Sequence, residues 1–198
     1  MQRRYTISDE NEYISLVGQK KKCVQKSFES PNFKKKGDSI REIYEDGSIY
    51  EGEIKKGLRN GKGKFTYAEG GVYEGDWKNG YIDGIGTLYF PNGKIAYEGE
   101  WRENKFWGKG IVYNENPKPS SQEIDYRNFM NLSYLWLKYE GQFLEDNKEG
   151  CGILYFTNGD KYKGIFTKDL INGKGTFFKA NGNAISGIWM KNRLEKLL

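Results

Sequence analysis

The sequence contains no histidine and only two cysteines, and these absences exclude several classes of site. Without histidine, neither a Ser-His-Asp or Cys-His catalytic arrangement nor a histidine-containing metal site can form. Cys23 and Cys151 have no metal-binding spacing and make no disulfide framework, which fits a reducing compartment. We therefore expect no catalytic residue, no cofactor, no metal and no enzyme activity.

Long apolar runs are also missing. No stretch approaches 18 apolar residues, and the first residues lack the apolar segment of a signal peptide, so we expect a soluble, cytoplasmic protein. Hydrophobic residues make up 36% of the chain and aromatic residues 16%, so Tyr, Phe and Trp carry much of the apolar surface. A thick aliphatic core is therefore not expected.

What the sequence does contain is a repeat. A unit of the form Tyr-x-Gly-x-aromatic or aliphatic begins at Tyr50, Tyr73, Tyr97, Tyr139, Tyr162 and, with Ile in place of Tyr, Ile185. Successive units start 23, 24, 42, 23 and 23 residues apart, and Gly-x-Gly follows eleven residues after each of the first five starts. A period in the twenties predicts an array in which each unit packs on its neighbours.

Two turns are expected in every repeat. A pair such as Asp46-Gly47, a strong hairpin signal, precedes the unit. Seven residues after each unit start stands a residue type that readily adopts positive φ: Gly57, Gly80, Asn104, Asp146, Asp169 and Asn192. Two turns per unit predict an all-β meander of about twelve antiparallel strands.

Strand alternation suggests a role for the glycines. Tyr73, Gly75 and Trp77 point to one face of a strand, so the glycine leaves a gap between two large rings. We expect this gap and the Gly-x-Gly of the return strand to form a slot in which a neighbouring aromatic ring lies against bare backbone.

These motifs resemble MORN (membrane occupation and recognition nexus) repeats, whose pattern is close to Tyr-x-Gly-x-Trp-x-x-Gly-x-x-x-Gly-x-Gly. One copy matches at every position: Tyr73, Gly75, Trp77, Gly80, Gly84 and Gly86. The resemblance covers about residues 44–192 and implies an elongated single-layer antiparallel meander of β-hairpins. The last copy lacks the Gly-x-Gly, which suits a terminal capping unit.

The chain divides into an N-terminal extension (1–39), a repeat array (40–192) and a C-terminal cap (193–198). The extension is basic, with nine Lys or Arg against five Asp or Glu, and we expect it to be partly helical or disordered. It is either a solvated arm or a contact for an anionic partner through two clusters: Lys20, Lys21, Lys22, Lys34, Lys35 and Lys36.

Two segments depart from the repeat. An insertion at about 114–138 ends in an apolar stretch containing Leu135 and Trp136, which either covers the sheet or docks a partner. After the last repeat, Leu194, Leu197 and Leu198 have the i, i+3, i+4 spacing of a short capping helix.

Three functions remain open. The resemblance implies a structural scaffold that binds other proteins, as in ciliary axonemes (particularly radial spokes) or the cytoskeleton, with a homodimer as a further possibility. It also allows a peripheral tether that binds anionic phospholipids through the repeats and the basic extension, or a regulatory subunit of a separate enzyme. Nucleic acid is not an expected partner, because no base-reading motif is present. The candidate protein-binding residues are Tyr73, Trp77, Tyr97, Trp101, Leu135, Trp136, Tyr139 and Tyr162.

Overall fold

The computed structural model describes residues 39–119, 123–132 and 134–198. The predictions made for the N-terminal extension, including both lysine clusters, fall outside these residues except at Ser39. The described residues form two compact units, the N-terminal unit (39–105) and the C-terminal unit (106–198).

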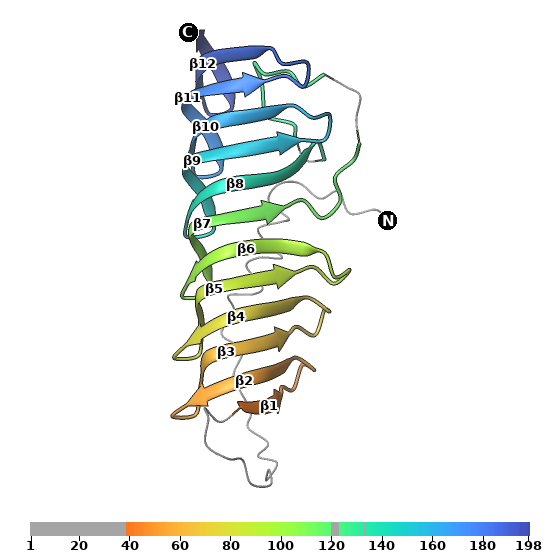
Figure 1. Cartoon of the computed structure of the whole chain (residues 1–198), viewed down its shortest axis with the longest axis vertical. Helices are drawn as coiled ribbons and strands as arrows, with labels where there is room; N and C mark the ends of the chain where they lie inside the picture. Colours follow the sequence, from red (N-terminus) through yellow and green to blue (C-terminus); the bar gives the residue numbers. More distant parts are fainter. Residues whose placement is uncertain (1–38, 120–122, 133) are drawn as a thin grey trace. The chain divides into compact units, whose positions relative to one another are not determined.

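All regular structure in the described residues is β-strand (Figure 1). The N-terminal unit contains β1 (Ser39–Ile43), β2 (Ile49–Lys55), β3 (Leu58–Thr66), β4 (Val72–Lys78), β5 (Tyr81–Tyr89) and β6 (Ile95–Arg102). The C-terminal unit contains β7 (Lys105–Tyr113), β8 (Trp136–Leu144), β9 (Asn147–Phe156), β10 (Lys161–Thr167), β11 (Leu170–Phe178), β12 (Ala184–Met190) and β13 (Arg193–Leu197). The first residue of β7, Lys105, is assigned to the N-terminal unit.

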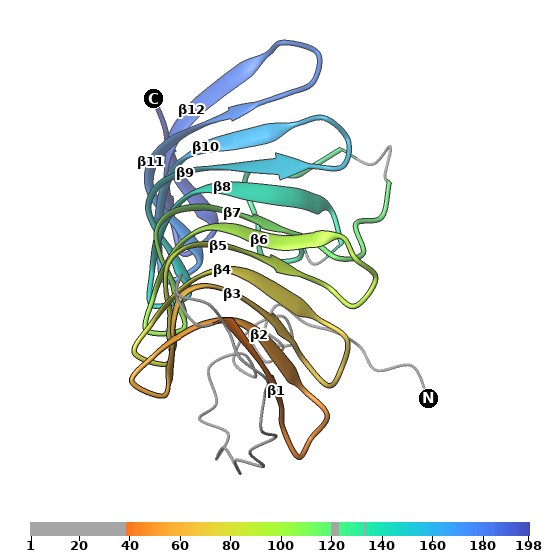
Figure 2. The same cartoon turned by 60° about the horizontal axis from the view of Figure 1, so that its bottom comes forward.

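Within each unit the strands are ordered as in the sequence, and hydrogen-bonded neighbours are antiparallel. The prediction of an all-β antiparallel meander is therefore confirmed. The described strands number thirteen rather than about twelve. Register shifts interrupt four strand pairs just after the repeat glycine, as between Gly75 and Trp77 on β4. Such bulges bend a strand, and the strands in Figure 2 are visibly curved.

The turns in the middle of the repeats have the predicted geometry. All six predicted positions have φ between 67° and 89°: Gly57, Gly80, Asn104, Asp146, Asp169 and Asn192. The preceding residue also has positive φ in every case: Lys56, Asn79, Glu103, Glu145, Lys168 and Lys191. Two consecutive positive φ angles are typical of type I′ hairpin turns, whose twist matches that of the flanking strands.

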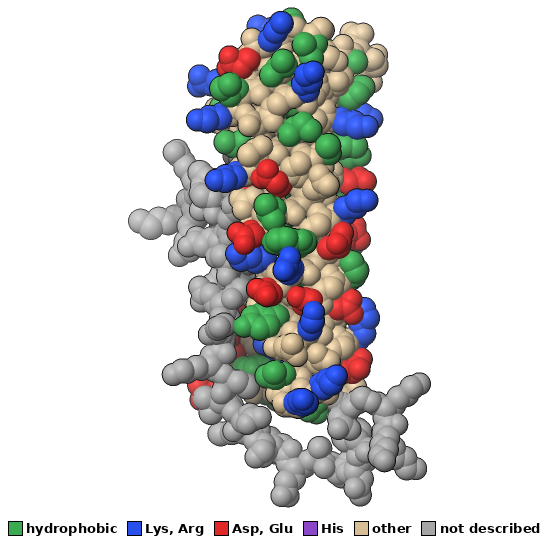
Figure 3. Space-filling view, turned by 90° about the vertical axis from the view of Figure 1, so that its left-hand side faces the viewer, with side chains coloured by type: hydrophobic (Ala, Val, Ile, Leu, Met, Phe, Trp, Pro, Cys, Tyr) green, Lys and Arg blue, Asp and Glu red, His purple; other side chains and the backbone are tan. Residues whose placement is uncertain are grey.

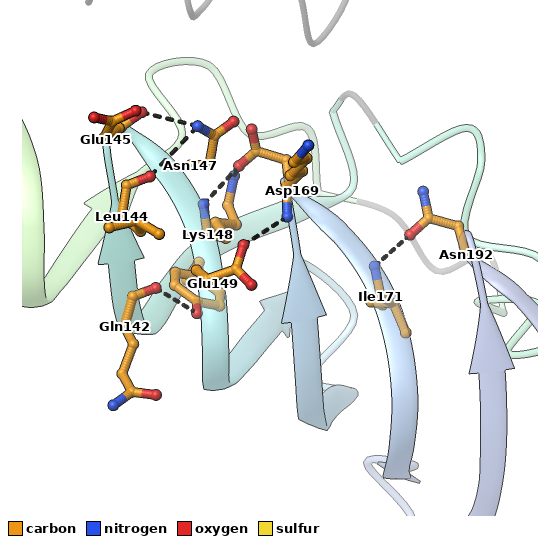
Figure 4. Close-up of polar contacts among 11 residues, drawn as sticks. Gln142, Leu144, Glu145, Asn147, Lys148, Glu149, Asp169, Ile171 and Asn192 are labelled. Atoms are coloured by element: carbon orange, nitrogen blue, oxygen red, sulfur yellow. Dashed lines mark hydrogen bonds and ion pairs between the residues drawn. The ribbon is translucent and has the colours of Figure 1, made fainter.

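These turns also connect successive repeats. The side-chain oxygen of Asn192 accepts a 2.7 Å hydrogen bond from the backbone nitrogen of Ile171 (Figure 4). The backbone nitrogen of Asn192 donates a 2.9 Å hydrogen bond to the Ile171 carbonyl. Asp169 makes the same pair of bonds with Lys148, at 2.9 and 3.1 Å. An Asn or Asp therefore serves two purposes here, since it tolerates positive φ and bonds to the preceding repeat.

The predicted glycine slot is present, and the ring in it is the tyrosine of the same repeat. Gly75 on β4 pairs with Gly86 on β5, and the Tyr73 ring lies against both. A β-carbon on Gly75 would lie 2.5 Å from the Gly86 α-carbon and 2.6 Å from the Ile85 carbonyl oxygen. Glycine is therefore required here by lack of space. Tyr50, Tyr139 and Tyr162 occupy equivalent slots.

The insertion covers one face of the C-terminal unit. We call residues 123–132 the strap, and three of its side chains are buried: Ile124, Phe129 and Leu132. The Phe129 ring lies 5.6 Å from that of Tyr162 and 5.9 Å from that of Phe177. Of the two roles considered for the insertion, covering the sheet is the one that these contacts support.

The predicted C-terminal helix is wrong, because Arg193–Leu197 form strand β13, paired with β12. The Leu194 side chain occupies the space over Gly187, whose added β-carbon would lie 2.6 Å from a Leu194 methyl carbon. The Leu194 nitrogen also donates a 2.9 Å hydrogen bond to the carbonyl of Arg127 in the strap. Leu197 and Leu198 remain more than half exposed, so the helical spacing buries no common face. A six-residue helix would not be stable alone, whereas another strand extends the existing ladder.

Candidate protein-interaction surface

The repeat aromatics proposed for protein binding lie in the interior. Tyr73, Tyr97, Tyr139 and Tyr162 are fully buried, and Trp77 and Trp101 are 4% and 3% exposed. Their rings pack edge to face, as between Tyr73 and Trp101, with centroids 5.2 Å apart. We call the face that carries these rings the inner face and the opposite side the outer face. A partner must use side chains other than these rings.

Burial also determines the ionisation of the slot tyrosines. The Tyr50 hydroxyl donates a 2.7 Å hydrogen bond to the Glu53 carbonyl, and Tyr73 donates a 3.0 Å bond to the Asp76 carbonyl. Burial raises the pKa of Tyr50 to about 12, and raises that of Tyr73 further. These phenols are therefore neutral at physiological pH and act as structural donors.

The other proposed contacts have different positions. Trp136 belongs to β8 and is 5% exposed, while Leu135 precedes that strand and is half-buried. Neither presents the exposed apolar side chain that a docking segment would need. The six lysines proposed for an anionic partner, at 20–22 and 34–36, lie outside the described residues.

The outer face of the C-terminal unit carries a row in which aromatic residues alternate with lysines. In the order of strand pairing this lysine-aromatic row consists of Tyr113, Lys138, Tyr155, Lys161 and Phe178. The Lys138 ammonium lies 4.8 Å from the centre of the Tyr155 ring, and that of Lys161 lies 5.4 Å from the Phe178 ring. Such contacts hold the lysine stems along the rings and leave the charged ends in water.

Neighbouring rows of this face add positive charge. Lys163 and Lys174 are exposed, and among the described residues neither forms an ion pair. The acid on these rows is Glu140, whose carboxylate is 3.5 Å from the Lys138 ammonium and 3.4 Å from the Tyr155 hydroxyl. Burial, with the nearby Glu140 charge, raises the pKa of Tyr155. Most of the positive charge on this face is therefore available to an external anion.

The corresponding rows of the N-terminal unit are different, because their basic residues pair with acids on the next strand. Examples among the described residues are Arg41 with Glu51 at 3.3 Å, Lys62 with Asp76 at 2.7 Å and Lys64 with Glu74 at 3.1 Å. Although burial acts to raise the pKa of Asp76, hydrogen bonds from Lys62 and the Ile85 amide lower it overall.

Acids outnumber bases on these rows, which contain Glu51, Glu53, Glu74, Asp76, Glu98 and Glu100 against Arg41, Lys62 and Lys64. Figure 3 shows one side of the molecule in a space-filling view, with Lys and Arg in blue and Asp and Glu in red. The two outer faces thus differ in the sign of their excess charge.

Sequence reasoning missed the basic face, although a signal for it existed. Lys161 and Lys163 flank Tyr162, so alternation alone places them on the side opposite the buried ring. What the sequence does not supply is the cross-strand register that brings Lys138 beside Tyr155.

Two kinds of feature are absent from the described residues. No group of three or more Cys, Asp or Glu side chains there is arranged to hold a metal ion. None of the described segments is a helix long and apolar enough to cross a membrane.

Comparison with known proteins identifies the repeat. The profile of the MORN repeat matches residues 50–72, 73–95, 97–113, 139–161 and 162–184. Among solved structures, the chain is similar to the TCP domain of SAS-4 (dCPAP) of Drosophila melanogaster in complex with a proline-rich motif of Ana2 (dSTIL). The identity is 20% and the TM-score 0.32, over 76% of this chain and 72% of that one. A search of curated proteins gives no significant match. Since the five repeats account for more than half of its length, the chain belongs to the MORN repeat family.

Proposed function

We propose that the chain is a non-catalytic adaptor whose outer face in the C-terminal unit binds an acidic surface of another protein. The observation that carries this proposal is the set of exposed lysines Lys161, Lys163 and Lys174, which described acids leave largely unneutralised. Membership of a family of protein-binding or membrane-associated repeats supports a binding role.

The composition of this face suits a protein partner. Positive charge accelerates encounter with an acidic surface, and that attraction weakens as salt increases. Tyr155 and Phe178 add half-buried ring surface between the lysines, which favours a partner that also offers apolar side chains. An acidic protein segment with interspersed apolar residues matches both properties.

The family resemblance suggests where such an adaptor works. We propose a subunit of a ciliary axonemal, radial-spoke-like or cytoskeletal assembly in the cytoplasm, in which the chain pairs with other subunits or with a second copy of itself. The specific assembly is an inference from the family alone.

A membrane tether is the second candidate, because the same lysines would also attract anionic phospholipid headgroups. In that case the basic clusters at 20–22 and 34–36 would add to the attraction. A regulatory subunit of a separate enzyme is the third candidate, and it would use the same protein-binding surface.

A charge-reversal experiment tests the proposal. The variant carries Lys161→Glu, Lys163→Glu and Lys174→Glu, and the control carries Lys55→Glu, Lys56→Glu and Lys94→Glu, three exposed lysines of the N-terminal unit. Each tagged protein is purified from cells of the source organism, and its partners are quantified by mass spectrometry. The main partner is then tested with purified components at increasing salt.

We expect the outer-face variant to recover at least tenfold less of its partner while melting at the same temperature, and the control to behave as wild type. Equal recovery by both variants would reject the outer face as the contact. Charge-dependent sedimentation with phosphatidylserine vesicles at physiological salt, without a protein partner, would instead support the tether.

A further inference from the structure

Strands β4 and β6 carry a group of acids on the outer face of the N-terminal unit. We call these four carboxylates the acidic patch: Glu74, Asp76, Glu98 and Glu100. Strand β5 between them places two uncharged residues in the same rows, Thr87 and Ile85, and Ile85 is 57% exposed. On β3, Lys62 and Lys64 pair with the two acids of β4, so these rows of β3–β6 hold four acids against two bases. The patch thus offers excess negative charge around an accessible apolar side chain.

The outer face of the C-terminal unit carries the opposite charge. We call three of its lysines the basic patch: Lys161 and Lys163 on β10 and Lys174 on β11. All three are exposed, and none forms an ion pair among the described residues. Ile153 on β9 is paired with Lys163, and its half-buried side chain lies on the same face. The basic patch therefore also combines charge with apolar surface.

The two patches match in spacing because the same repeat builds both. The two lysines of β10 are two residues apart on their strand, as are the two acids of β6, so the residues of each pair lie about 7 Å apart. Each patch also places an isoleucine one strand away from a charged member. Ile85 is paired with Glu100, as Ile153 is with Lys163. A lysine pair that faces an acid pair would therefore bring the two isoleucines to the same contact.

The sign of the charge decides which of these surfaces can meet. Two basic patches repel each other, and so do two acidic patches, because like charges brought together across an interface are unfavourable. A basic patch and an acidic patch attract, and every chain carries one of each. We propose that the basic patch of one chain binds the acidic patch of a second copy of the chain. This contact rests on the proposed function, since it identifies the acidic protein surface that the same lysines bind.

The ion pairs already present on the acidic patch do not prevent this contact. The side chains of Lys64 and Glu74, which are 3.1 Å apart, are 46% and 47% exposed. Such exposed ion pairs contribute little to stability and are screened by salt, so the carboxylates can also accept lysines of a second copy. Covering Ile85 with the apolar surface beside Lys163 removes further apolar area from water. The contact therefore combines charge attraction with apolar burial.

Sedimentation velocity of the purified full chain, over a range of protein and salt concentrations, tests this self-contact. The wild type is compared with the outer-face variant described above, in which the three lysines of the basic patch are Glu. An acidic-patch variant carries three substitutions: Glu74→Lys, Glu98→Lys and Glu100→Lys. A control reverses three exposed acids of the same unit outside the patch: Glu45→Lys, Glu69→Lys and Glu103→Lys.

We expect the wild type and the control to associate, less so as salt increases, and each patch variant to associate at least tenfold more weakly with an unchanged melting temperature. Mixing the two patch variants should restore association, because the outer-face variant keeps its acidic patch and the acidic-patch variant keeps its basic patch. A wild type that stays monomeric, or a mixture that does not associate, would overturn the proposal.

A second measurement needs no variant. A carbodiimide condenses a lysine amine and a carboxylate into an amide, with the loss of water, and so joins only groups in direct contact. In a mixture of isotopically light and heavy wild type, we expect Lys161 or Lys163 to be joined to Glu98 or Glu100 of the other chain. Crosslinks of these residues only within one chain would reject the self-contact. The adaptor function would still stand if the outer-face variant lost a different protein partner in cells, so the two proposals fail separately.

Discussion

The Tyr73 ring lies directly against the backbone of Gly86 on the neighbouring strand. The contact leaves no volume for a side chain at Gly86 or at its partner Gly75. The repeat therefore requires residues without a side chain at both positions. Burying an aromatic ring of 150–250 Å² contributes roughly 4–6 kcal/mol at about 25 cal/mol/Å². In a sheet without a thick aliphatic core, the Tyr73 ring and the similarly buried Trp77 ring are major sources of burial within the repeat.

We predict that Gly75→Val destabilises the protein by about 3 kcal/mol, because the added side chain must displace the Tyr73 ring or the paired strand. Thr87→Val places the same side chain on the outer face of β5 and should change stability by less than about 0.5 kcal/mol. Urea unfolding followed by tryptophan fluorescence measures both. If Gly75→Val unfolded at the same urea concentration as the wild type, the space beside the Tyr73 ring would not require glycine.

The turn residue Asn192 should stabilise the fold in two separable ways, through its side-chain hydrogen bond and through its tolerance of positive φ. Asn192→Ala loses the hydrogen bond to the Ile171 nitrogen and places alanine at φ 69°, so we expect a loss of about 2 kcal/mol. Asn192→Gly loses only the hydrogen bond and should cost about half as much. Urea unfolding of the two variants tests this order. Equal losses would mean that backbone strain contributes nothing at this turn.

Sequence periodicity predicted most of the fold because its signals are local. A tyrosine and a glycine two residues apart lie on one face of a strand whatever the rest of the chain does, and Asp146 or Asn192 favours positive φ by its own chemistry. The residue before each of these could not be predicted in the same way. Lys56 and Glu103 adopt positive φ because the hairpin imposes it, and neither residue type signals it.

The parts that the sequence did not predict depend on distant contacts. Residues 127–129 of the strap bond to 192–194, and no local pattern indicates a contact across more than 60 residues. The same contact explains the C-terminal error, since Leu194 pairs with β12 on one side and the strap on the other. Likewise, the lysine-aromatic row can be recognised only once the cross-strand register is known.

High pH should unfold the protein through its slot tyrosines. The pKa of Tyr50 is about 12 in the folded state and about 10 in an unfolded chain. Its neutral form is therefore favoured by folding, and the resulting stability is complete below pH 10 and is lost as the pH rises from 10 to 12. Urea unfolding midpoints should fall little between pH 8 and 10 and much more between pH 10 and 11. Tyr50→Phe should show a shallower fall, and an unchanged midpoint at pH 11 would contradict the assignment.

Removing the strap's central ring should uncouple the strap from the sheet. Phe129→Ala leaves a void among the rings of Phe156, Tyr162, Phe177 and Trp189, and we expect a loss of about 3–5 kcal/mol. The neighbouring Met130 is 49% exposed, so Met130→Ala provides a matched control with less than about 1 kcal/mol of change. Hydrogen exchange should also accelerate at the backbone amides of Phe129 and Leu194. The Phe129 amide donates to the Asn192 carbonyl, and the Leu194 amide donates to the Arg127 carbonyl in the strap. If both variants unfold together and exchange stays slow, the strap is held by its backbone bonds and not by the Phe129 ring.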